Sequence, residues 1–541
     1  MKKILSIVLI ASIIMTFTGC GKKDDSKSSS NSGTSNNIVY DGEFGKIVDE
    51  PVDLRIHLSQ EDKDVLTSDM PIVKYLSEAT GINIIGSANP GAGDSAGAFN
   101  LQAADGFPDD IYAGNELGSM FMQFGSEGAF VPINEYLDKM PNFSAFLESD
   151  LRVKASITAP DGNIYYIPYM QPDMTASKAY FIRKDWLDKY ELKTPSTVTE
   201  LEETLLDIID SDPNGNGQED EFGFFARKPE EIVRLANLFG ARVYGNDNDS
   251  ERYIPTEDGK LYHAWLQPEF KDAIKNVSRW YDLGIIDNEY ITNPESRRDH
   301  YLLNNLGAMT YDWIASTSGY NERKNVVEGF EFIPMAPPEN SNGKKVNEHV
   351  RPIITSSGWA ISSKCKNIDV AIALFDTMFT EYGRTIANFG VEGEQWEYVD
   401  DVPTFMDDVL NNDEGKPVNL YLRDNVGAQL FMGFKQDYEY ERQWTSDWGL
   451  KGIEIYGTGE YDVPTLPALV FTNEEFDILN KYLTNINSFI DESVHSWIIR
   501  PYEELTNEVW DEYLSQVEKL GIEQVTKAYQ DAYSRYIEIM K

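Results

Sequence analysis

The sequence predicts an α/β fold, and three observations support this prediction. A strand-like segment at 52–58, a helix-like segment at 71–79 and a strand-like segment at 81–85 form a βαβ opening. Helix-like and strand-like segments then alternate to about residue 365. From residue 476 onward, apolar residues recur every three or four positions, which is typical of packed helices. The 541 residues leave room for about three to five ordinary domains or for two large lobes.

Composition excludes several classes of protein. Hydrophobic residues make up 41% of the chain, enough for a sizeable core. The 90 acidic and 47 basic residues give a formal net charge of -43, which repels nucleic acid and anionic lipid. Only two cysteines are present, so a disulfide scaffold is excluded, and five scattered histidines argue against a histidine-rich zinc enzyme.

The N-terminus has the pattern of an export signal. Lys2 and Lys3 precede an apolar run at 4–15 that is too short to span a bilayer permanently. The segment 17–20 (FTGC) resembles the lipobox of bacterial lipoproteins, which implies cleavage before Cys20 and lipidation of its thiol. An ordinary secretory signal with a chance cysteine is the alternative. We therefore expect a signal peptide at 1–19, a lipidated flexible tether at 20–45, and a protein anchored by lipid on the outer face of the cell membrane.

One polar loop has the spacing of an EF-hand calcium site. Acidic and amide residues alternate from Asp212, and Gly217 stands where such a loop turns sharply. Position twelve is Gly223 rather than glutamate, so Glu221 would supply the missing carboxylate. The alternative is a polar turn without an ion. The expected ligands of a structural Ca²⁺ are Asp212, Asn214, Asn216, Gln218, Asp220 and Glu221.

Six segments follow one another in the order of a known family: GFPDDI at 106–111, DGNIYYIP at 161–168, FIRKDWLD at 181–188, NNLGAMTYDW at 304–313, SGWAIS at 357–362 and NFGVEG at 388–393. Together they resemble the extracellular solute-binding lipoproteins of bacterial ABC transporters that import sugars, in particular the alginate-oligosaccharide-binding group. The similarity runs from about residue 50 to the end of the chain. It departs from the family pattern at Glu191, where glycine is usual, and at Phe17, where the lipobox usually has leucine.

This resemblance implies a type II periplasmic-binding-protein-like fold with two lobes joined by hinge crossovers and a helical C-terminal part. It assigns residues 46–172 and 358–400 to lobe 1 and residues 173–357 and 401–541 to lobe 2. It also implies a monomeric binding protein, not an enzyme, that closes on an oligosaccharide and delivers it to the permease subunits of an ABC importer. In the alginate-binding relatives the loop equivalent to the one at Asp212 binds calcium.

Residues that follow buried strands are the candidates for the ligand cleft, because ligands bind where strand ends meet. Tryptophan side chains suit stacking on sugar rings, although burial in the core is an equal alternative for each of them. The expected ligand-binding residues are Gln60, Asn115, Tyr169, Tyr311, Trp313, Trp359 and Trp396.

Two other functions remain open from the sequence. A secreted glycoside hydrolase would also be acidic and rich in aromatic residues, and it needs two carboxylates about 5–10 Å apart. The GxSxG pattern around Ser95 follows a loop rather than an apolar strand, which argues against a nucleophile elbow. The second alternative is a surface protein that binds sugar but serves no transporter, with a peptide-binding receptor as a weaker variant.

Overall fold

The computed structural model describes residues 37–60, 64–89, 91, 94–172, 175–243, 252–292, 297–347, 349–430 and 433–541. The predicted signal peptide and Cys20 lie outside these ranges. Residues 37–541 form one compact unit. Within the described ranges, no helix combines the length and the apolar character needed to cross a membrane.

The first sheet has five strands in the order β2-β1-β3-β11-β4. Its first three strands run parallel, as a βαβ opening requires, whereas β11 runs antiparallel to both of its neighbours. The pairing of β11 with β4 shifts register between Ile354 and Gly358. The strands are β1 (Val52–Ser59), β2 (Ile82–Gly86), β3 (Ile111–Gly114), β4 (Ile167–Met170) and β11 (Ile354–Ile361).

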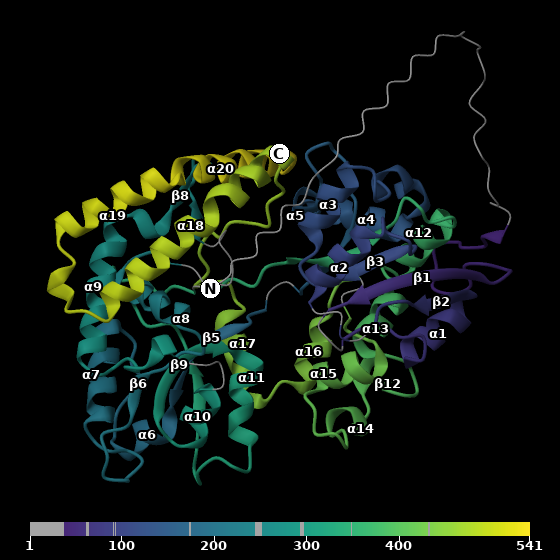
Figure 1. Ribbon diagram of the computed structural model, residues 1–541. Helices are drawn as coiled ribbons and strands as arrows, with labels where there is room; N and C mark the ends of the chain where they lie inside the picture. Colours follow the sequence, from purple (N-terminus) through teal and green to yellow (C-terminus); the bar gives the residue numbers. More distant parts are fainter. Residues whose placement is uncertain are drawn as a thin grey trace, which may run out of the picture. The chain divides into compact units, whose positions relative to one another are not determined.

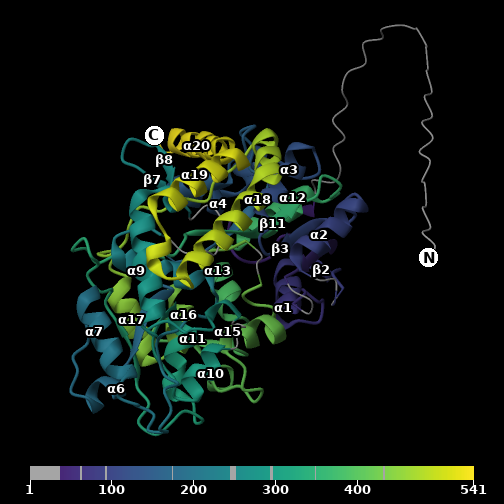
Figure 2. The ribbon, with the colours of Figure 1, turned by 60° about the vertical axis from the view of Figure 1, so that its left-hand side comes forward.

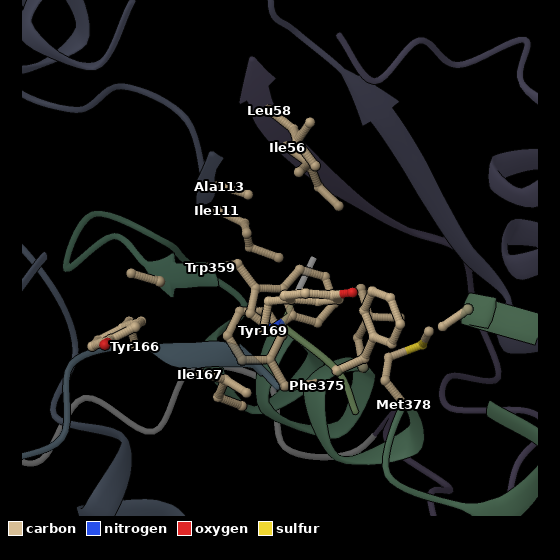
Figure 3. Close-up of a cluster of buried hydrophobic side chains, with 14 of the residues drawn as sticks. Ile56, Leu58, Ile111, Ala113, Tyr166, Ile167, Tyr169, Trp359, Phe375 and Met378 are labelled. Carbon is tan, nitrogen blue, oxygen red and sulfur yellow. The ribbon is translucent and has the colours of Figure 1, made fainter. Parts of the chain in front are cut away.

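Helices and one hairpin pack around this sheet and complete its core. Figure 3 shows the centre of that core, where Trp359 of β11 lies against Phe375 of α12 and near Met378. The helical segments are α1 (Pro71–Thr80), α2 (Ser95–Ala104), α3 (Gly118–Ser126), a 3₁₀ turn (Ile133–Lys139), α4 (Pro141–Ser149), α5 (Leu151–Ile157), α12 (Ile368–Thr377), α13 (Glu381–Phe389), α14 (Asp407–Leu410), α15 (Val418–Tyr421), a π-helical turn (Leu422–Val426) and α16 (Tyr438–Trp444). The hairpin is β12 (Trp396–Val399) with β13 (Val402–Phe405).

The second sheet has four strands in the order β10-β5-β9-β6. β6 and β9 run parallel, so their carboxyl ends meet at one edge, while β5 is antiparallel to β9 and β10. The strands are β5 (Lys178–Arg183), β6 (Phe222–Phe224), β9 (Gly307–Trp313) and β10 (Phe332–Met335). A separate hairpin joins β7 (Tyr253–Pro255) to β8 (Leu261–His263).

The C-terminal helices build the core of the second sheet's lobe. Both views of the ribbon show α18, α19 and α20 lying together beside α9 (Figures 1 and 2). The longest of them, α18, begins at a capping box in which Thr472 and Glu475 each bond the other's backbone N–H. The helices are α6 (Lys184–Lys189), α7 (Val198–Ile209), α8 (Glu230–Val233), α9 (Pro268–Asp282), α10 (Arg297–Leu303), α11 (Ile314–Ser318), α17 (Asp447–Tyr456), α18 (Asn473–Ile498), α19 (Asn507–Leu520) and α20 (Ile522–Ile539). Short 3₁₀ turns lie at Arg234–Phe239, Ala264–Leu266, Tyr290–Thr292, Gly319–Glu322 and Tyr502–Glu504.

The packing of the cores departs from the predicted division of the chain in two places. Residues 405–440 contribute apolar side chains to the first core, including Phe405, Leu422 and Tyr440, rather than to the second as expected from residue 401 onward. Residues 37–45 are also part of the body rather than tether, because the Tyr40 hydroxyl donates to the buried carboxylate of Asp376 (2.6 Å). The sequence pattern could not predict that residues 405–440 pack on the first core or that Tyr40 contacts Asp376, because these partners lie far apart along the chain.

The chain passes between the two sheets along three connections, which we define by residues: connection 1 is 171–177, connection 2 is 336–353, and connection 3 is 445–446. Connection 3 joins α16, which packs on the first core, to α17, which packs against β10 and α11 of the second sheet. Residues of these connections and of the elements that they join line one pocket, which is described below.

Candidate ligand-binding site

A pocket of about 160 Å³ lies among the three connections. Connection 1 supplies three of the lining residues, and connection 2 supplies Arg351. The last residues of β9 and of α16 are both tryptophans that line the pocket. Its lining residues are Gln171, Ala176, Ser177, Trp313, Ile314, Ala315, Arg351, Glu441, Trp444 and Ile453.

Trp313 is the one predicted ligand residue that lines this pocket. It ends β9, and its side chain is 37% exposed, although it is a large aromatic residue. The Lys178 ammonium lies 4.7 Å from the centre of its ring, and His349 meets the ring edge-on. The cation therefore covers part of the indole surface and orients it, because a cation is attracted to the face of an aromatic ring.

Two polar atoms in the pocket wall are buried without a hydrogen-bond partner. They are the Ser177 hydroxyl and the Trp444 indole N–H, and neither has a partner in the described part of the chain. An unsatisfied buried donor costs about 1–3 kcal/mol, so such groups need an explanation. Hydroxyl groups of a bound molecule would satisfy both.

A buried carboxylate orders the edge of the second sheet beside Trp313. Asp312 is fully buried, and its oxygens accept from Arg298 (2.6 Å) and from the Trp313 backbone N–H (2.7 Å). Arg227 approaches the same carboxylate at 3.5 Å. Two arginines thus compensate one buried charge, as burial of an ion requires.

The edge of the first sheet carries two predicted residues, Gln60 and Asn115, after the parallel strands β1 and β3. The Ser95 hydroxyl joins them by donating to the Gln60 carbonyl (3.1 Å) and accepting from the Asn115 backbone N–H (2.9 Å). The Ser357 hydroxyl donates to Asn115 Oδ1 (2.6 Å), and Gln60 Oε1 is buried without a partner. Ser95 is thereby engaged in hydrogen bonds at the start of α2.

Tyr169 and Tyr311 are buried and hydrogen-bonded. The Tyr169 hydroxyl donates to Gln436, and burial raises its pKa, with the nearby Arg351 acting in the opposite direction. The Tyr311 hydroxyl donates to Asn347 Oδ1 (3.0 Å). Both remain predicted ligand residues, and neither lines the pocket.

Trp359 and Trp396 were expected to stack on sugar, and their burial contradicts this expectation. Trp359 is 1% exposed and stacks on Phe375 with ring centres 4.0 Å apart. Trp396 is fully buried, and its indole N–H donates to the Gly390 carbonyl (2.9 Å). Both are core residues, because the side chains packed around them leave no ring face for a ligand.

The predicted calcium loop lies between α7 and β6. Asp212, at positive φ, accepts hydrogen bonds from the backbone N–H groups of Gly215 (2.9 Å) and Gly217 (2.9 Å), which curl the loop around its carboxylate. The Asn214 and Asn216 side-chain amides both donate to Asp220, at 3.0–3.1 Å. The donor oxygens expected from the spacing are therefore gathered in one short loop.

Glu221 closes this loop from the strand side. Its Oε1 accepts from the Asn214 N–H (3.1 Å), whereas its Oε2 is buried without a partner. Burial raises the pKa of Glu221, and the neighbouring charges of Asp220 and Asp212 raise it further. A bound cation would stabilise the charged form of Glu221 and supply a partner for its Oε2. Among the described residues, no group of three or more histidine, cysteine, aspartate or glutamate side chains is placed so that it could hold a metal ion.

Sequence reasoning missed most of the pocket. Gln171, Arg351, Glu441 and Trp444 come from segments that pack together only in the folded chain. The available signal was Arg351 itself, a lone arginine just before the strand at 354–361.

A family model and a relative of known name both match this chain over more than half of its length. Residues 63–384, more than half of the chain, match the family model described as bacterial extracellular solute-binding protein. The fructooligosaccharide ABC transporter substrate-binding protein FusA of Streptococcus pneumoniae is 25% identical over 489 residues, covering 86% of this chain and 87% of FusA.

Two solved structures are also similar. The crystal structure of alginate-binding protein AlgQ2 without calcium ion is 38% identical, with a TM-score of 0.76, and the match covers 91% of this chain and 100% of AlgQ2. An EF-hand mutant of FusA in complex with fructo-nystose is 21% identical, with a TM-score of 0.70 over 90% of this chain and 99% of FusA, and shows the shared fold.

Proposed function

Because this chain belongs to the family of bacterial extracellular solute-binding proteins, we propose that it captures an oligosaccharide and delivers it to the permease of an ABC importer. FusA is named as a fructooligosaccharide-binding component of such a transporter, and AlgQ2 as an alginate-binding protein. The lobes would close on the sugar by bending at connections 1 to 3.

The observation that carries the proposal is the pocket among the connections. Trp313 and Trp444 offer aromatic surface for the apolar face of a sugar ring. The unpartnered Ser177 hydroxyl and Trp444 N–H, together with Arg351 and Glu441, offer hydrogen bonds to its hydroxyl groups. This mixture of flat apolar surface and convergent polar groups suits a carbohydrate.

A thermal-shift panel tests the proposal with fructo-oligosaccharides, alginate oligosaccharides, and plant and bacterial glycans. A bound sugar at about a hundredfold excess over its Kd stabilises the folded state by about 2.7 kcal/mol. Trp444→Phe and Ser177→Ala, which remove the two unpartnered donors, should weaken binding, whereas Tyr398→Ala on the exposed hairpin strand β12 should not. No shift with any sugar would contradict the proposal.

The same panel separates a binding protein from a hydrolase. We propose that the chain is not an enzyme, and its relatives are named as substrate-binding transport proteins. Chromatography of the incubated sugars should therefore show intact oligosaccharide. Cleavage products at a useful rate would favour the glycoside hydrolase. A sugar-binding surface protein without a transporter would shift in melting temperature but would fail to stimulate a co-reconstituted permease.

We also propose that the loop from Asp212 to Glu221 binds a structural Ca²⁺, which would offset the negative charge of the Asp212, Asp220 and Glu221 carboxylates and join the end of α7 to β6. Support comes from the gathered oxygens, from the unpartnered Glu221 Oε2, and from relatives described by a calcium-free form or an EF-hand mutation. Ca²⁺ should raise the melting temperature of the parent chain, and chelation should lower it. Asp212→Asn with Asp220→Asn should abolish that response, while Asp207→Asn on α7 should retain it.

Anchoring by lipid at Cys20 is the third part of the proposal. The lipobox-like segment 17–20 and the membership of an extracellular family support it. The tether would then lie before residue 37, because residues 37–45 belong to the body. Mass spectrometry of the membrane fraction should find lipid on Cys20, and Cys20→Ser should release the protein into the medium.

A further inference from the structure

A single side chain links the connections between the two sheets. Arg351 belongs to connection 2, and its Nε donates to the Gln171 side-chain oxygen in connection 1. Its Nη1 donates to the Thr175 hydroxyl of the same connection (3.0 Å) and to Glu441 Oε2 (2.7 Å). Glu441 lies in α16, the helix that leads into connection 3.

These contacts form where water has little access. The side chains of Arg351 and Glu441 are 9% and 11% exposed. Hydrogen bonds between ionised groups are stronger than neutral ones, and a low local dielectric strengthens them further. The planar fork of the guanidinium fixes three directions at once, which a lysine ammonium on a flexible stem cannot reproduce.

From this geometry we infer that Arg351 is a positioning residue that sets how the two lobes are held relative to one another. Any bend between the lobes must pass through connections 1 to 3, and Arg351 ties connection 1 and the helix that leads into connection 3 to connection 2. Arg351 and Glu441 also line the pocket. If the proposed sugar-binding function is correct, a ligand bonded to either group acts directly on the hinge.

A second ion pair provides a matched control. Arg279 of α9 contacts Glu202 of α7 at 2.7 Å between Nη1 and Oε1, with side chains 34% and 23% exposed. Both helices pack in the core of the second lobe. Breaking this pair changes stability within one lobe and leaves the three connections untouched.

The test uses the purified protein without ligand, so its result does not depend on which sugar binds. Small-angle X-ray scattering and amide hydrogen exchange are recorded for the parent chain, Arg351→Gln, Arg351→Lys, Glu441→Gln and Arg279→Gln. Arg351→Gln and Glu441→Gln should broaden the distribution of interlobe distances. They should also accelerate exchange in connections 1 and 2 by about 10- to 100-fold, which matches the loss of charge-assisted hydrogen bonds. Arg351→Lys should show a partial effect.

Arg279→Gln should leave both the scattering profile and exchange in the connections unchanged, even if it lowers the melting temperature. Scattering profiles for Arg351→Gln and Glu441→Gln that superimpose on the parent profile would overturn the inference. Should Arg351→Gln fail to fold, Glu441→Gln and Arg351→Lys decide the outcome. A failed sugar panel with altered scattering would count against the proposed function alone, and binding with unaltered scattering would count against the hinge role alone.

Discussion

The two sheets place their tryptophans and their polar edges differently. Trp359 on the first sheet is 1% exposed and stacked on Phe375, whereas Trp313 on the second sheet is 37% exposed and faces the pocket. The first edge is held by neutral groups, with Ser357 donating to Asn115, while the second edge is built around the buried charge of Asp312.

This difference indicates where each lobe can tolerate change. Neutral buried groups need only a hydrogen-bond partner, whereas a buried carboxylate needs compensating charge. The second edge therefore depends on the ion pairs of Asp312 with Arg298 and Arg227. Asp312 also accepts from the Trp313 backbone N–H, which helps to position Trp313. In the first sheet, the tryptophan Trp359 packs in the core. Four substitutions, ordered by the expected size of their effect, would break or sharpen this contrast.

Trp359→Ala should have the largest effect on stability. The substitution removes a large buried side chain and leaves a cavity beside Phe375, which costs about 3–5 kcal/mol. Urea unfolding, monitored by circular dichroism, measures this loss in the free energy of unfolding. If the variant unfolds at the same urea concentration as the parent, the first-sheet tryptophan is not a core residue.

Asp312→Ala should destabilise the second lobe by about 3 kcal/mol, because it leaves Arg298 and Arg227 without their buried counter-charge. Hydrogen exchange across β9 and urea unfolding measure the change. The control is Asp299→Ala in the same helix as Arg298, where an exposed pair with Arg323 at 3.4 Å contributes less than about 1 kcal/mol. Equal losses in both variants would remove the distinction between buried and exposed charge.

Ser357→Ala should cost about 1–2 kcal/mol at the first edge. The buried hydroxyl donates to Asn115 and accepts from the Glu116 N–H (3.2 Å), and its removal leaves neutral partners unsatisfied. The same unfolding measurement applies. A loss as large as that of Asp312→Ala would show that neutral and charged edges are equally demanding.

Trp313→Ala should have the smallest effect on stability, about 1 kcal/mol or less, because its ring is 37% exposed and loses mainly its contact with the Lys178 ammonium. Its effect should appear in binding instead, as a loss of about tenfold or more in affinity for the sugar that the panel identifies. Isothermal titration measures that affinity, with Tyr398→Ala as the surface control. Unchanged affinity would remove Trp313 from the site.

Local patterns predicted the elements well where neighbours in sequence are neighbours in space. Residues 197–200 have capping-box spacing, and the structure contains half of such a box at the start of α7. The Glu200 N–H donates to the Thr197 hydroxyl (3.2 Å), whereas the Glu200 carboxylate accepts from the Ser196 N–H (2.8 Å). The βαβ opening and the helical C-terminal part are confirmed by β1, α1, β2 and α18–α20. The family resemblance is confirmed by the match over residues 63–384. The candidate site was less predictable, because Trp313 ends one largely buried strand and Trp359 lies within another, and the local sequence does not reveal what packs on each ring.

The sequence by itself determined the α/β alternation, the acidic surface, the candidate lipidation site at Cys20 and the short loop from Asp212 to Glu221, since each depends on residues within a few positions of one another. Only the tertiary structure decided which tryptophan is exposed, where residues 405–440 pack, and that Arg351 meets Glu441 across 90 positions. Burial and ion pairing depend on contacts between distant segments, and these contacts exist only once the sheets and their connections have assembled.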